Sequence, residues 1–262
     1  MSASLVGSEM CIRDSNNYDP VSENGAGGNV DGFGGHPASA SCTGNVFKGC
    51  RAWYNSDDGF DLIKAQAAYT IEDCWAFYNG YKPGGFVGAG DGTGFKAGGY
   101  GMRSKVKMPN EIPHHVVKNC LAYKNKNKGF YANHHLGGIF WFNNTGYQNP
   151  SNFCMLNRKS AEETVNVGGY GHVIQDNLSY MPRSAGKHIV DVDPEECTIV
   201  NNSFLPVDMT VEEGDFVSLD ASQLTLPRKA DGSLPDIGFL KLRRDSKLYD
   251  AKVGFQFPSQ NL

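Results

Sequence analysis

The chain has 262 residues, of which 40% are hydrophobic, and it carries a formal net charge of -4. This length allows one extended core with a small appendage, and no apolar run in the sequence is long enough to cross a bilayer. The mild acidity argues against a nucleic-acid partner, because phosphate contacts come mainly from Lys and Arg. The 32 glycines, together with little helical periodicity, favour strands joined by tight turns.

The first residues differ in character from the rest. Residues 4–15 resemble a translated sequencing adaptor of the kind that recurs at the ends of assembled reads. We therefore predict that residues 1–15 are a non-native segment that should be excluded from fold reasoning. On this interpretation the native N-terminus and any export signal lie outside the sequence. A genuine irregular N-terminal arm is the alternative.

A repeated phrase runs through the chain from residue 50 onward. Each copy has Cys or Asn, any residue, a small residue and an aromatic residue, and three of the five intervals between copies are 24 residues. The copies are Cys50–Trp53, Cys74–Phe77, Cys120–Tyr123, Asn144–Tyr147, Asn177–Tyr180 and Asn201–Phe204. Because the cysteines occupy one position of the phrase, we expect small buried hydrophobes there and no disulfides.

Two further columns accompany this phrase. One consists of Gly-Phe pairs at 32–33, 59–60, 94–95 and 129–130, with Asn152–Phe153 as a weaker fifth member. The other consists of Asn17, Asn55, Asn79, Asn125 and Asn149. Gly and Asn suit the turns between strands. A unit of about two dozen residues with short β-runs predicts an all-β solenoid, a parallel β-helix, in which equivalent positions of successive coils lie about 4.8 Å apart.

Charged residues converge when the coils are aligned on the Gly-Phe pairs. Asp31 and Asp58 precede the glycine, Asp61 and Lys96 follow the phenylalanine, and Asp57 belongs to the same turn as Asp58. Like charges this close repel one another, and a bound cation would resolve the repulsion. Because every candidate ligand is a carboxylate, the sequence predicts a Ca²⁺ site.

The chemistry of such a site favours proton removal next to a carboxylate. We expect a cation beside Lys96 to disfavour its ammonium form, so that Lys96 can remove the C5 proton of a uronic acid residue. Calcium on the uronate carboxylate would stabilise the developing charge, and the outcome would be β-elimination across C4 and C5. Taken singly, an Asp-Gly pair or a lysine is more often structural, and a calcium site without chemistry is the alternative.

The phrases at 29–33, 55–61 and 90–99 resemble those of polysaccharide lyase family 9, and the resemblance covers roughly residues 16–205. It implies a right-handed parallel β-helix, calcium held by Asp31, Asp57, Asp58 and Asp61, and Lys96 as the base. The tail between residues 215 and 242 also resembles the C-terminal segment of that family. We therefore predict a catalytic domain over 16–205, with N-terminal coils missing, and a C-terminal extension over 206–262 packed on it.

The resulting functional prediction is a secreted or periplasmic, monomeric, calcium-dependent pectate lyase that acts on polygalacturonate, without membrane or nucleic-acid partners. A rhamnogalacturonan lyase of the same fold is the nearest alternative. Others are a β-helix glycoside hydrolase, which would use paired carboxylates and water, and a non-catalytic polysaccharide-binding solenoid. Asn133, His134 and Arg158 are candidate substrate-binding residues, because the first two lie one coil beyond Lys96 and Arg158 offers a bidentate fork for a carboxylate.

Overall fold

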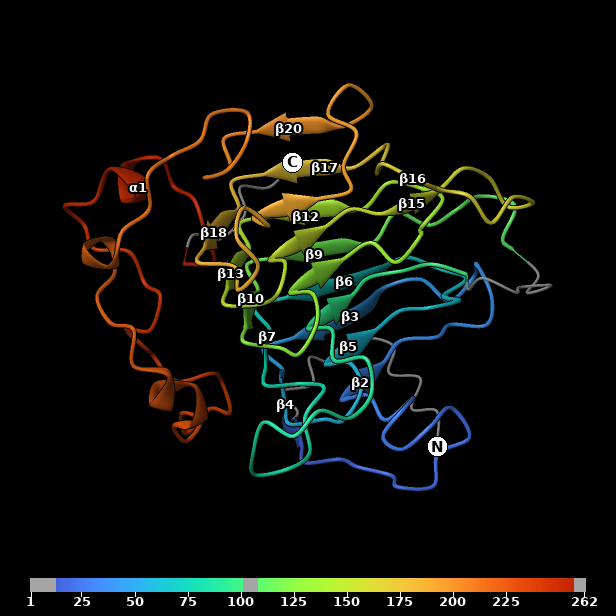
Figure 1. Ribbon diagram of the computed structural model, residues 1–262, viewed down its shortest axis with the longest axis horizontal. Coiled ribbons are helices and arrows are strands. Elements are labelled where there is room, and N and C mark those ends of the chain that lie inside the picture. The colour runs from blue at the N-terminus through green and yellow to red at the C-terminus, as the bar shows by residue number, and fades with distance from the viewer. Residues whose placement is uncertain (1–12, 101–107, 257–262) are drawn as a thin grey trace.

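The computed structural model describes residues 13–100 and 108–256, and its coils stack as a parallel β-helix (Figure 1). Three sheets of six parallel strands run along the stack, and most coils contribute one short strand to each. The predicted fold class is therefore confirmed. Within the described residues no helix has the length and apolar character of a membrane-spanning segment.

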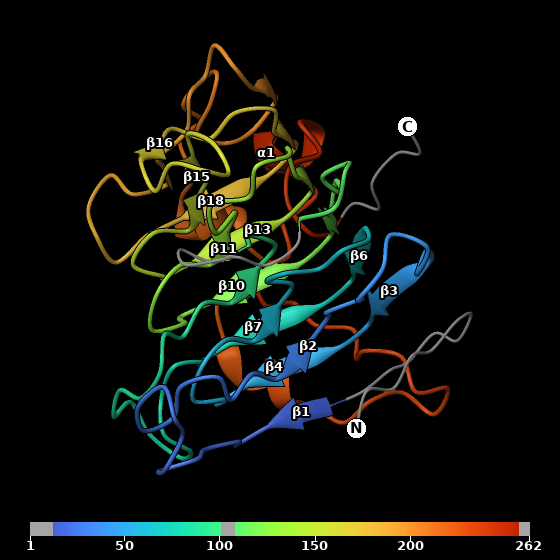
Figure 2. The same ribbon diagram turned by 90° about the vertical axis from the view of Figure 1, so that its right-hand side faces the viewer.

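The three sheets follow the columns seen in the sequence. Figure 2 shows the strands of the first sheet, sheet A, rising coil by coil from β1. Sheet A contains β1 (Arg13–Ser15), β4 (Arg51–Trp53), β7 (Trp75–Phe77), β10 (Leu121–Tyr123), β13 (Thr145–Tyr147) and β18 (Leu178–Tyr180). Sheet B contains β2 (Phe33–Gly34), β5 (Phe60–Asp61), β8 (Phe95–Lys96), β11 (Phe130–Tyr131), β14 (Phe153–Cys154) and β19 (Ile189–Val190). Sheet C contains β3 (Asn45–Lys48), β6 (Tyr69–Glu72), β9 (Val116–Lys118), β12 (Phe140–Phe142), β17 (Val173–Gln175) and β20 (Thr198–Val200).

The Gly-Phe column forms the centre of the core. The rings of Phe33, Phe60, Phe95, Phe130 and Phe153 stack from coil to coil, with neighbouring centroids 4.9, 4.9, 5.0 and 4.8 Å apart. Burying such a column of aromatic side chains removes much apolar surface from water. The stack therefore fixes the register of sheet B along the whole solenoid.

The Asn column forms a buried ladder at the turn between sheets A and B. Amide side chains link Asn17 to Asn55 at 2.9 Å, Asn55 to Asn79 at 3.2 Å, and Asn79 to Asn125 at 3.0 Å. The ladder continues through Asn149, and from Asn55 to Asn149 its side chains are fully buried, so they must pair with one another and with the backbone. The cysteine prediction is also confirmed, because all six cysteines within the described part of the chain are free.

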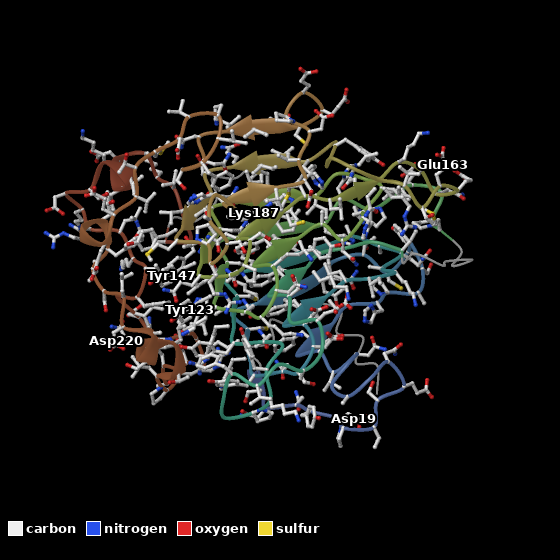
Figure 3. The ribbon with its side chains drawn as sticks, viewed as in Figure 1. Asp19, Tyr123, Tyr147, Glu163, Lys187 and Asp220 are labelled. Atoms are coloured by element: carbon white, nitrogen blue, oxygen red, sulfur yellow. The ribbon has the colours of Figure 1, made fainter. Side chains whose placement is uncertain are left out.

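A C-terminal segment covers the outer face of sheet A (Figure 3). It contains two short 3-10 helices, η1 (Glu213–Asp215) and η2 (Ala221–Thr225), and the helix α1 (Lys247–Asp250). Its buried side chains, among them Phe239, pack against the aromatic positions of sheet A, such as Tyr123 at 5.1 Å between ring centroids. This face of the solenoid is therefore closed to a ligand.

Two features at the edges of the solenoid bear on the predicted boundaries. The segment Arg13–Ser15, part of the stretch expected to be non-native, forms β1 and pairs in parallel with β4, and residues 1–12 lie outside the described part. An antiparallel pair, β15 (Asn157–Arg158) with β16 (Asn166–Val167), follows sheet B after β14. No pattern in the sequence indicated this pair, since its strands have two residues each.

Replacing Asn125 with Ala tests the ladder. The Asn125 side chain accepts from the Asn79 backbone amide at 3.1 Å and donates to the Ala76 carbonyl at 2.9 Å, so its loss leaves two buried backbone groups unpaired. We expect the free energy of unfolding to fall by about 2–4 kcal/mol, measured by urea unfolding. The exposed Asn24→Ala is the matched control, and equal stability of the two variants would contradict this role of the ladder.

Candidate metal centre on the outer face of sheet B

One row of side chains points outward from sheet B. Successive residues of a strand face opposite sides, so the residue after each buried phenylalanine faces away from the core. Strand pairing places Asp61 opposite Lys96 and Lys96 opposite Tyr131. The predicted juxtaposition of Asp61 with Lys96 on adjacent coils is therefore present.

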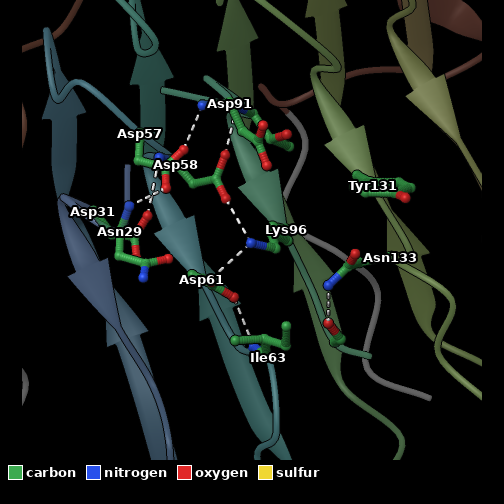
Figure 4. A network of polar contacts seen from close by, with 12 residues as sticks. Asn29, Asp31, Asp57, Asp58, Asp61, Ile63, Asp91, Lys96, Tyr131 and Asn133 are labelled. Carbon is green, nitrogen blue, oxygen red and sulfur yellow. Dashed lines mark hydrogen bonds and ion pairs between the residues drawn. The ribbon is translucent and has the colours of Figure 1, made fainter. Parts of the chain in front are cut away.

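Three carboxylates and one ammonium meet at the start of this row (Figure 4). Asp31, Asp58 and Asp61 each have a carboxylate oxygen within 4.8 Å of the others. The Lys96 Nζ lies 3.0 Å from an oxygen of Asp58 and 3.0 Å from an oxygen of Asp61. Asp58 is fully buried and Asp61 is 5% exposed, so water screens these charges weakly.

Backbone amides orient the three carboxylates. Asp58 Oδ1 accepts from the Thr93 amide at 2.7 Å, and Asp31 Oδ1 accepts from the Asp58 amide at 3.0 Å. Asp61 Oδ1 accepts from the Ile63 amide at 2.7 Å. Each carboxylate thus uses one oxygen to fix its position and keeps the other for the cluster. The backbone amides therefore fix the carboxylates in place, and the side chain that a cation would have to displace is Lys96.

Asp57 has a different role in the observed geometry. Its two oxygens accept from the backbone amides of Asn29 and Asp91, each at 2.5 Å, so it ties together three segments of successive coils. Gly90 is required beside it, because a Cβ at that position would lie 2.8 Å from Asp57 Oδ1. The structure therefore brings together three of the four predicted ligands, Asp31, Asp58 and Asp61. Asp57 lies next to them and holds backbone segments together. Each of its oxygens keeps a second lone pair, which could still bind a cation.

Burial and mutual repulsion perturb the titration of the cluster. Burial, and then the neighbouring Asp61, Asp58 and Asp57 carboxylates, raise the pKa of Asp31 to about 8. Burial also raises the pKa of Asp58 to about 7, although Lys96 opposes the shift. When Asp31, Asp58 and Asp61 are all ionised, the cluster carries three negative charges and the single positive charge of Lys96. One ammonium does not balance these carboxylates.

The donor set fits a divalent cation of the calcium type. The cluster offers only carboxylate oxygens, which calcium prefers and which zinc sites with His or Cys ligands lack. A divalent charge would also relieve the repulsion that raises the pKa values of Asp31 and Asp58. The residues present therefore suit the predicted metal.

The two carboxylates that pair with Lys96 shift the titration of its amine. Burial alone would lower its pKa, but the Asp58 and Asp61 carboxylates outweigh burial and raise the pKa above its usual value. The ammonium form is thus favoured while Lys96 is paired with these two carboxylates. That a bound cation disfavours the ammonium form stays a prediction.

The predicted substrate-binding residues lie on the side of sheet B where its strands end. Asn133 donates its side-chain amide to the Gly98 carbonyl at 2.8 Å, which is a structural contact. His134 Nδ1 lies 3.4 Å from the Tyr131 hydroxyl, and Arg158 lies on β15 with 5% exposure. Sequence reasoning missed Tyr131, although its position one residue after Phe130 in the Gly-Phe column could have placed it beside Lys96.

Comparisons with known proteins agree with this geometry. A family model described as "Pel9A-like, right handed beta helix region" matches residues 5–175. Pectate lyase L of Dickeya dadantii (strain 3937) is 34% identical over 90% of this chain and 48% of its own length. Pectate lyase PEL9 of Emericella nidulans is 30% identical over 82% of this chain and 51% of its own length.

Two solved structures are similar to this one. A rhamnogalacturonan lyase superposes with a TM-score of 0.87 at 50% sequence identity, covering 94% of this chain and 59% of that protein. The pectate lyase Pel9A superposes with a TM-score of 0.66 at 33% identity, covering 90% of this chain and 52% of that protein. The chain spans about half the length of the curated relatives it matches.

The raised pKa values of Asp31 and Asp58 predict a pH-dependent calcium affinity. Below about pH 7–8 protons occupy these carboxylates, and they must leave before a cation binds. The affinity for calcium should therefore fall by roughly tenfold for each unit that the pH is lowered, for each proton displaced. Isothermal titration calorimetry at several pH values from about 6 to about 9 would measure this. An affinity that does not change over that interval would contradict the assignment of these two residues as ligands.

Proposed function

The chain belongs to the Pel9A-like right-handed β-helix family, and we propose that it is a calcium-dependent polysaccharide lyase that cleaves a uronate-containing pectic polymer by β-elimination. The observation that carries this proposal is the position of Lys96, 3.0 Å from two of three clustered carboxylates on the outer face of sheet B. The proposed base, Lys96, and the proposed cation site therefore lie close enough together to contact the same sugar residue. Removal of a proton adjacent to a carboxylate needs the base to accept the proton and the cation to stabilise the charge that develops.

In the proposed reaction the Lys96 amine accepts the C5 proton of a uronate residue. The electron pair of that C–H bond forms the C4–C5 double bond, and the C4–O4 bond breaks, with O4 taking a proton from solvent. Calcium, when bound, would supply positive charge that stabilises the negative charge developing on the uronate. Asp57, Asp58 and Asp31 hold their positions through backbone amides and do not take up the proton.

Lys96 must first lose its own proton. Its ammonium is stabilised by Asp58 and Asp61, two of the proposed ligands. When these carboxylates bind a cation instead, Lys96 loses both stabilising partners, and its pKa falls toward the range in which a free amine is available. The pKa of Lys96 would thus fall for two reasons, the positive charge of the cation and the loss of the two carboxylates that stabilise the ammonium.

The substrate is proposed from the comparisons. The rhamnogalacturonan lyase is 50% identical to this chain, whereas the pectate lyases are 30 to 36% identical. We therefore favour a rhamnogalacturonan backbone as the substrate, with polygalacturonate as the second candidate. Because such polymers are too large to cross a membrane, we further propose that the protein acts as a secreted or periplasmic monomer.

A glycoside hydrolase of the same fold is less well supported. Hydrolysis requires two carboxyl groups with separate roles on either side of the scissile bond. Here Asp58 and Asp61 both pair with Lys96 and share one cluster with Asp31. The geometry concentrates negative charge at one place, which suits cation binding.

Replacing Lys96 with Ala tests the proposed base. We expect the rate of unsaturated uronate formation, followed by ultraviolet absorbance with calcium present, to fall by at least about a hundredfold. Lys118→Ala is a matched control, because Lys118 also forms an ion pair, with Glu72 at 3.1 Å, but lies on sheet C. We expect faster turnover of rhamnogalacturonan than of polygalacturonate. Substantial activity retained by Lys96→Ala on either polymer would rule out this residue as the base.

A further inference from the structure

A second positive side chain lies one coil beyond Lys96 on the same face of sheet B. Tyr131 is the strand partner of Lys96, and Figure 4 shows it on the neighbouring strand. The Lys128 Nζ lies 4.6 Å from the centroid of the Tyr131 ring. A cation over an aromatic face at this distance is held by the ring electrons. Lys128 is therefore positioned beside the row that contains the proposed base.

Lys128 differs from Lys96, because its ammonium has no carboxylate partner within the described part of the chain. Lys96 pairs with two carboxylates, and Lys126, from the same turn, donates to the carbonyls of Ala89 and Gly90. Among residues 13–100 and 108–256, Lys128 Nζ forms no ion pair with a carboxylate. A half-buried ammonium in this position is available to an anion.

The surroundings of Tyr131 are mixed in charge. Burial, then Arg158 and Lys128, lower the pKa of His134, so both cations lie close to this histidine. Asp91 and Asp191 are the acidic groups that act on Tyr131. Lys96, Asp191 and Asp91 are thus the charged groups that act on Tyr131 from its surroundings, and Lys128 lies over its ring.

Because successive coils are about 4.8 Å apart, comparable with the length of one sugar residue, a polymer lying along the stack would place one residue per coil. We propose that Lys128, held on the ring of Tyr131, binds the carboxylate of the uronate residue adjacent to the reacting one when the bound stretch is polygalacturonate. In rhamnogalacturonan the adjacent residue is a neutral rhamnose, which offers Lys128 no carboxylate. This inference rests on the proposed lyase function. It assigns Lys128 and Tyr131 to substrate binding and leaves the chemistry to Lys96.

The test compares Lys128→Gln with Lys124→Gln. Lys124 is a matched control, because its Nζ also lies over an aromatic ring, that of Phe86 at 4.7 Å, but in the turn that leaves sheet A. Turnover would be measured with calcium on rhamnogalacturonan and on polygalacturonate. Binding of oligosaccharides from both polymers would be measured by calorimetry in the Lys96→Ala background, where no cleavage interferes.

On polygalacturonate we expect Lys128→Gln to raise KM and the oligosaccharide Kd about fivefold, the size of one partly exposed ion pair, with kcat changed less than about twofold. On rhamnogalacturonan we expect KM and Kd to change less than about twofold, because the ion pair is absent there. Lys124→Gln should match the wild type, and Lys128→Arg should restore binding, because it keeps the charge. The wild-type Kd should also rise more steeply with salt than that of Lys128→Gln. These differences would not follow from a purely structural lysine.

An unchanged Kd for polygalacturonate oligosaccharides in a folded Lys128→Gln variant, or an equal loss in Lys124→Gln, would overturn the assignment while the lyase function stands. Folding would be checked by the thermal unfolding midpoint, and Tyr131→Phe, which keeps the ring under the ammonium, should bind nearly as well as wild type. A wild-type chain that cleaves neither polymer would instead overturn the proposed function, and the second uronate site with it.

Discussion

The stacking of coils is the constraint on which the site depends. In a parallel β-helix the same position of successive coils recurs about every 4.8 Å, so side chains that share a column must be neighbours. The phenylalanine column uses this spacing for a core, with ring centroids 4.8 to 5.0 Å apart. Next to it the same spacing forces Asp31, Asp58 and Asp61 together. The repulsion among these three carboxylates is therefore a consequence of the coil spacing.

The fold offsets this repulsion with backbone amides and with Lys96. Strands of sheet B have only two residues each, so turns bring the amides of Thr93, Asp91 and Ile63 to the carboxylates. These hydrogen bonds offset part of the cost of burying several carboxylates and hold them in fixed positions. They leave Lys96 and a cation as competitors for the same oxygens. In the proposed mechanism that competition would link metal binding to the protonation of Lys96.

Much of this arrangement was predictable from the sequence because repeats convert spacing into proximity. Aligning Gly-Phe pairs placed Asp61 beside Lys96, and the strand pairing agrees. Three features could not be predicted in this way. The Asp57 carboxylate accepts from the backbone amides of Asn29 and Asp91, and these contacts depend on the conformation of the loops. The ion pairs of Lys96 depend on side-chain direction, and the position of Lys128 over Tyr131 depends on a rotamer.

The central claim is that Lys96 and a calcium ion share the carboxylates of Asp58 and Asp61. The most direct measurement is the pKa of the Lys96 amine by nuclear magnetic resonance on isotope-labelled lysine, with its signal assigned by Lys96→Arg, with and without calcium. The account predicts that without calcium the pKa lies above its usual value and that calcium lowers it markedly. A Lys96 pKa that calcium leaves unchanged would contradict the account, because the metal and the base would then not share these ligands.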